Sequence, residues 1–115
     1  MEPAFSLDYY DHIFGERGEE FWELVQAVRD ELERYPEELA RAAGSRDLQA
    51  LSRLRHAHRP MMINLSLEDL RTLETNVDGA IRTGAPSEQL SLLVEEFEHR
   101  ARTVVQDLDG LIPGP

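Results

Sequence analysis

The residues best suited to chemistry lie between Leu54 and Met62, in the stretch Leu-Arg-His-Ala-His-Arg-Pro-Met-Met. Two histidines, His56 and His58, stand there among arginines. A neutral imidazole is a nucleophile near pH 7, and a guanidinium group holds phosphoryl oxygens through paired hydrogen bonds. These residue types therefore indicate phosphate chemistry.

The charge of the chain makes this stretch unusual. The net charge is −11, and the chain has 12 arginines and no lysine. An acidic surface argues against binding to nucleic acid or to anionic membranes, since both need basic surfaces. The absence of lysine excludes Schiff-base and P-loop lysine mechanisms. Within this acidic chain, five arginines fall in one stretch whose only acid is Asp47: Arg41, Arg46, Arg53, Arg55 and Arg59.

The length of 115 residues predicts a single domain over 1–115, with a flexible tail from about residue 111 to 115. No apolar run approaches the roughly 18 residues that a membrane span needs, and no signal-peptide pattern opens the chain. We therefore expect a cytoplasmic protein. The chain has no cysteine, which excludes disulfides and thiolate chemistry.

Hydrophobic residues recur with helical periodicity throughout, and no segment alternates as a strand would. Ser6 can cap a short helix that ends near Phe14. A long helix is expected from about Gly18 to Gly44. Pro36 lies within it and should kink or divide it.

Three further helices are expected. Asp47 is a suitable cap for the first, and Ser66 with Asp69 resembles a capping box at the start of the second. The second should close near Gly84, and Pro86 suits the first turn of the third. The sequence thus predicts an all-α fold, an antiparallel up-down four-helix bundle with a short extra N-terminal helix.

Helical phase separates the two histidines. At 100° per residue, His58 falls on the apolar face of its helix, while His56 points about 160° away from the middle of that face. Arg59 lies about 60° around the helix from His56, so its side chain can reach a group on that histidine. Pro60 removes the amide that would bond the His56 carbonyl. It either bends the helix around the core or leaves a low surface where a partner can approach His56.

These residues resemble the histidine phosphotransfer (HPt) domains of multistep two-component phosphorelays. In that family a phosphorylated histidine precedes a variable residue, an apolar residue, lysine and glycine. His56 matches the phosphorylated position, with His58, Arg59 and Pro60 at the apolar, lysine and glycine positions. The helices before and after this motif follow the family's layout in order, so the resemblance covers nearly the whole chain.

The resemblance implies a phosphocarrier rather than an enzyme with kinase activity of its own. His56 would exchange a phosphoryl group with the aspartate of a response-regulator receiver domain, and Arg59 would stabilise the phosphoryl oxygens. The receiver would supply Mg²⁺, so the chain itself needs no cofactor. The implied partners are receiver domains and a hybrid histidine kinase, and the implied state is a monomer.

Two other hypotheses remain open. The chain could be a pseudo-HPt module that binds receivers without accepting phosphate. Alternatively, Glu96 and His99 form a Glu-x-x-His pair of the kind found in di-iron bundles. No second such pair exists in the sequence, and both residues lie off the apolar face of their helix, which argues against a metal site. We expect a structural role for His12.

Overall fold

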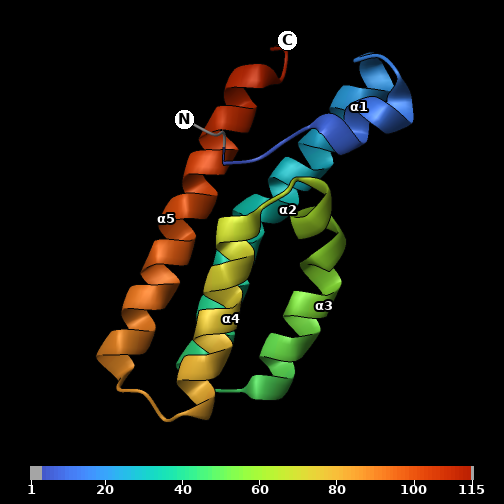
Figure 1. Cartoon of the computed structure of the whole chain (residues 1–115). Coiled ribbons are helices and arrows are strands. Elements are labelled where there is room, and N and C mark those ends of the chain that lie inside the picture. Colours follow the sequence, from blue (N-terminus) through green and yellow to red (C-terminus); the bar gives the residue numbers. More distant parts are fainter. Residues whose placement is uncertain (1–3, 115) are drawn as a thin grey trace.

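The computed structural model describes residues 4–114, and all regular secondary structure in this range is helical (Figure 1). No strand occurs among these residues, as the hydrophobic periodicity predicts. The helices are α1 (Asp8–Phe14), α2 (Glu19–Gly44), α3 (Leu48–Asn64), α4 (Glu68–Arg82) and α5 (Ser87–Leu111).

The four long helices lie side by side, and the short α1 packs beside the start of α2 (Figure 1). Helix α2 contacts both α3 and α5, and α4 contacts the same two helices. Apolar residues from all four meet in one core. Its largest fully buried side chains include Phe21, Leu32, Leu39, Leu51, Met62, Leu65, Leu70, Phe97 and Leu108. The apolar stripes of the sequence therefore face one another, as amphipathic helices require.

Polar contacts tie the short connections to each other. Arg46, at a positive φ of 52° in the connection after α2, donates a hydrogen bond to the carbonyl of Ala85 in the connection after α4. Far from these, the amide of Ser6 donates to the carbonyl of Leu65, 2.8 Å away, in the connection after α3. These bonds fix the ends of the helices relative to one another.

The expected cap of α3 is confirmed, since the Asp47 side chain accepts a hydrogen bond of 3.0 Å from the Ala50 amide. The expected cap of α1 is not: its N-cap is Leu7, which has no side-chain cap. Ser6 lies one residue earlier, where its Oγ accepts a hydrogen bond of 3.1 Å from the Asp8 amide.

The capping box expected at Ser66 and Asp69 is wrong. The N-cap of α4 is Leu67, and no side chain caps this helix. Ser66 instead has a positive φ of 57°, in the left-handed region, while the Leu67 amide bonds the carbonyl of Met62. Ser66 therefore belongs to the turn that ends α3, and its left-handed backbone prevents it from acting as the N-cap of α4.

Neither proline divides its helix. Helix α2 runs without interruption through Pro36, and α3 runs through Pro60. Pro36 itself is buried, with the fully buried Leu32 and Leu39 on either side of it. Apolar packing on both sides therefore holds the helix together across the missing amide, and the predicted division of α2 at Pro36 is wrong.

Helix α5 continues through Gly110 and ends at Leu111, the residue near which the tail was expected to begin, and residue 115 of that tail lies outside the described residues. Leu108 is fully buried, and Ile112 packs against the core one turn later. Arg29 of α2 also donates two hydrogen bonds to the Asp109 carboxylate, of 2.7 and 3.0 Å. Contacts that the periodicity does not reveal thus extend this helix.

A buried polar pair links α2 to α4 through the core. Tyr35 is fully buried, and its hydroxyl donates a hydrogen bond to the carboxyl of Glu74, which is only 4 % exposed. The Tyr35 ring also packs edge-on against Phe97 of α5, with ring centroids 5.4 Å apart. One side chain of α2 therefore contacts α4 through its hydroxyl and α5 through its ring.

Replacing Tyr35 by phenylalanine should destabilise the fold. The Tyr35→Phe variant keeps the ring but leaves a buried carboxyl without its donor, which costs about 1–3 kcal/mol. Tyr9→Phe is the matched control, because Tyr9 is 46 % exposed. Urea unfolding measures both free energies, and equal values for the two variants would remove Tyr35 from this role.

Candidate functional site: a histidine and arginines between α3 and α4

His56 lies in the middle of the exposed face of α3. Its exposure confirms the outward orientation that helical phase predicts. The exposed residues on this face within two turns of it carry no carboxylate: Gln49, Ser52, Arg53, Arg59, Pro60 and Ile63. The imidazole is therefore open to a large partner.

Arg53 and Arg59, one turn before and after His56, differ from most arginines of the chain. Among the described residues, no carboxylate lies within 4.0 Å of either guanidinium group. Seven other arginines do have such a partner: Arg17, Arg29, Arg55, Arg71, Arg82, Arg100 and Arg102. In a protein of net charge −11, two cations without acidic partners beside one exposed histidine favour an incoming anion.

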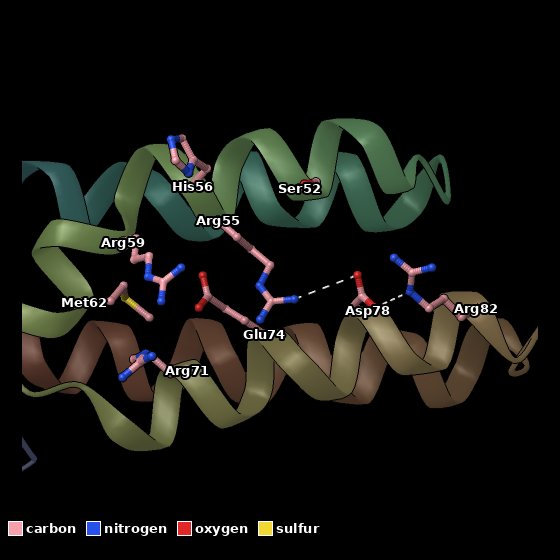
Figure 2. Close-up of a pocket in the computed structure, with 9 residues that line it drawn as sticks. All are labelled: Ser52, Arg55, His56, Arg59, Met62, Arg71, Glu74, Asp78 and Arg82. Atoms are coloured by element: carbon pink, nitrogen blue, oxygen red, sulfur yellow. Dashed lines mark hydrogen bonds and ion pairs between the residues drawn. The ribbon is translucent and has the colours of Figure 1, made fainter.

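A pocket of about 450 Å³ opens beside His56, between α3 and α4 (Figure 2). Arginines come from both helices, and two carboxyl groups lie among them. The lining residues are Ser52, Arg55, His56, Arg59, Met62, Arg71, Glu74, Asp78 and Arg82. The excess of arginines makes this pocket suited to anions.

Figure 2 shows that the side chains of α3 point in two directions at this site. The His56 ring stands at the rim, on the side of α3 away from α4, while Arg55 and Arg59 extend toward α4. Arg59 therefore faces the pocket rather than the imidazole. Its contact with a group on His56, as predicted from sequence, requires the exposed side chain to turn toward the histidine.

His58 is bound to neighbouring side chains, as its inward phase predicts. Its Nδ1 lies 2.7 Å from a Glu31 carboxylate oxygen, and its Nε2 lies 3.3 Å from one of Glu38. Its ring lies on that of Tyr35, with centroids 4.1 Å apart and planes 31° apart. Both ring nitrogens face carboxylates of α2, so His58 connects α3 to α2.

Glu74 forms the buried end of the pocket. Burial raises the pKa of its carboxyl above the ordinary value of 4.5, while the Tyr35 hydrogen bond and the charges of Arg55 and Arg71 oppose this rise. Asp78 is held differently, by Arg82 Nε at 2.6 Å and more loosely by Arg55 Nη1 at 3.8 Å.

Sequence reasoning missed the half of the pocket that α4 contributes, namely Arg71, Glu74, Asp78 and Arg82. One signal was present. Glu74 lies four residues after Leu70 and three before Val77, so it falls inside the apolar stripe of α4. A carboxyl at such a position requires a buried partner. The other three residues flank this stripe and carry no comparable signal.

The Glu96–His99 pair lies on the outside of α5. Glu96 binds Arg100 Nε at 2.6 Å, and His99 is exposed. Within residues 4–114, no cluster of three or more His, Cys, Asp or Glu side chains is arranged to hold a metal ion. No helix of this range has the length and apolarity to cross a membrane.

The raised pKa of Glu74 predicts a specific pH dependence of stability. Because the folded state holds this proton more tightly than the unfolded state, Glu74 contributes fully to stability below pH 4.5, and the contribution is lost as pH rises through the raised value. The free energy of unfolding of the wild type, minus that of Glu74→Gln, should therefore fall as pH rises above 4.5.

Urea unfolding between pH 4 and 8 measures this difference. Glu23→Gln is the matched control, since Glu23 is exposed on α2 and stays hydrated in both states. The raised pKa of Glu74 would be contradicted if the difference in unfolding free energy between wild type and Glu74→Gln rose with pH. It would also be contradicted if this difference changed with pH in the same way as the one for Glu23→Gln.

Comparison of the chain with protein-family models, with curated proteins and with solved structures finds no match.

Proposed function

We propose that the protein is a histidine phosphocarrier of the HPt type, which relays a phosphoryl group between His56 and receiver-domain aspartates. One observation carries the proposal. His56 is exposed on a face of α3 without carboxylates, between Arg53 and Arg59, which have no acidic partner among the described residues. A mobile phosphoryl group needs such an open nucleophile in a positive environment.

The proposal includes the arrangement of the helices. Helices α2 to α5 would form an antiparallel up-down four-helix bundle, with α1 as the short extra helix. The connections of three and four residues after α2, α3 and α4 favour it, since short connections join antiparallel neighbours. This arrangement would present His56 in the middle of a rigid helix, far from any mobile loop.

The proposed reaction replaces one P–O bond by one P–N bond. A neutral imidazole nitrogen of His56 attacks the phosphorus of the aspartyl phosphate in line, a P–N bond forms, and the P–O bond to the receiver carboxylate breaks. The receiver carboxylate leaves with the bonding electrons, and the second ring nitrogen keeps its proton. The reaction is reversible, and the receiver supplies the Mg²⁺ that such a transfer uses.

The arginines of the site contribute positive charge to the transfer and take no part in proton transfer. Arg59, once turned toward His56, would bind the phosphoryl oxygens through charge-assisted hydrogen bonds. The protein would work as a cytoplasmic monomer that meets receiver domains and a hybrid histidine kinase in turn, without kinase activity of its own.

The direct test is phosphotransfer from phosphorylated receivers of the source organism. We expect acid-labile label on the wild-type protein and none on the His56→Gln variant. The control is His99→Gln, which replaces an exposed histidine of α5 and should still take the label. No label on the wild type from any receiver, with binding retained, would establish the pseudo-HPt module instead. Label that persists on His56→Gln would assign the phosphate to another residue.

Arg59→Ala should slow the transfer. The loss of about one charge-assisted hydrogen bond to the phosphoryl group predicts a rate lowered by roughly tenfold or more. Helix content by circular dichroism should stay unchanged, because Arg59 is exposed. Arg41→Ala, which removes an exposed arginine of α2, should transfer at the wild-type rate. Equal rates for the two variants would remove Arg59 from the mechanism.

A further inference from the structure

The pocket between α3 and α4 has the size and chemistry of a small-molecule site. Its volume of about 450 Å³ falls within the range of roughly 300–1,000 Å³ found for ligand pockets. Met62 is the one apolar side chain among those that line it within the described residues. A ligand of this pocket would therefore be recognised by charge rather than by apolar packing.

The two ends of the pocket differ in how their charges are balanced. At one end Asp78 binds Arg82 and, more loosely, Arg55. At the other end Arg59 has no carboxylate within 4.0 Å among residues 4–114, and Arg71 has only Glu68, at 3.7 Å on the surface. Arg59 and Arg71 are therefore less neutralised than Arg82, although the buried carboxyl of Glu74 lies near Arg71.

In Figure 2, Arg59 of α3 and Arg71 of α4 lie on opposite sides of the Met62 side chain, and the carboxyl of Glu74 lies beside Arg59. That carboxyl is already engaged by the Tyr35 hydroxyl and buried to 4 % exposure, so it is held at the base of the pocket. Two guanidinium groups from two helices can bind one anion from both sides, each through a pair of hydrogen bonds.

We propose that this pocket binds a small phosphorylated anion, such as a phosphate monoester or pyrophosphate, between Arg59 and Arg71. The bound anion would hold Arg59 toward α4. Because Arg59 cannot bind the pocket anion and a group on His56 at once, the ligand would inhibit phosphoryl transfer. The inhibition rests on the proposed function, whereas the binding does not.

Binding is tested with inorganic pyrophosphate as the probe and the wild-type chain as the background, in the absence of any receiver domain. Titration followed by NMR, at constant ionic strength with sodium chloride, should give saturable one-to-one binding with shifts on both sides of the pocket. Adding Arg71→Ala should weaken the binding by about tenfold, as expected for one lost charge-assisted contact. Circular dichroism checks that the variant is folded.

Arg53→Ala is the matched control. It removes the same charge from the exposed face of α3 but lies outside the pocket, so the pyrophosphate affinity should stay within about twofold. Absence of saturable binding at millimolar pyrophosphate would overturn the proposal. Equal weakening by Arg53→Ala and Arg71→Ala would also overturn it, because it would indicate diffuse attraction without a site.

The inhibition is tested by phosphotransfer with free Mg²⁺ held constant. Pyrophosphate should slow transfer to the wild-type protein and have little effect on Arg71→Ala, whose pocket no longer binds it. Equal inhibition of both proteins would indicate that pyrophosphate acts on the receiver domain. It would overturn the proposal that the pocket anion and the phosphoryl group compete for Arg59. If no receiver phosphorylates the chain, the proposed function fails while the binding result stands by itself.

Discussion

The hydrogen bond between Tyr35 and Glu74 is the contact on which the rest of the structure depends. It lies in the core, where an unpaired carboxyl or hydroxyl group would be costly, so α2 and α4 must hold these two side chains in register. The Tyr35 ring contacts Phe97 of α5 on one side and His58 of α3 on another. One tyrosine of α2 thus contacts the other three long helices.

This constraint reaches the candidate site through helix α3. His58 is fixed by Tyr35, Glu31 and Glu38, all on α2, so the rotation of α3 about its own axis is fixed as well. His56 lies two residues away, and about 200° around the helix, on the opposite side. The half-buried His58 thereby holds the exposed His56 toward solvent. Glu74 connects the same core to the arginine pocket, because its carboxyl lies at the base of that pocket.

The separation of charge in this protein follows from the same architecture. Most arginines on the outer faces bind carboxylates of their own helix or of a neighbouring helix, which neutralises them locally. Helix α3 has no acidic residue within it, so its arginines depend on other helices for carboxylate partners, and in the described range α4 supplies the one partner they have. Arg55 finds Asp78 in this way, whereas Arg53 and Arg59 find no acidic partner in the described range. A positive surface therefore persists on an acidic protein.

The sequence by itself determined the helical elements, their approximate ends and the opposite orientations of His56 and His58. These follow from local periodicity and capping, which depend on residues close together in the chain. Only the tertiary structure decided that α2 continues through Pro36, that Ser66 ends α3 instead of capping α4, and that α5 extends to Leu111. It also decided the pocket, because the packing of α3 on α4 places Arg59 and Arg71 along one cavity, and no pattern within either helix specifies which side chains line the interface together.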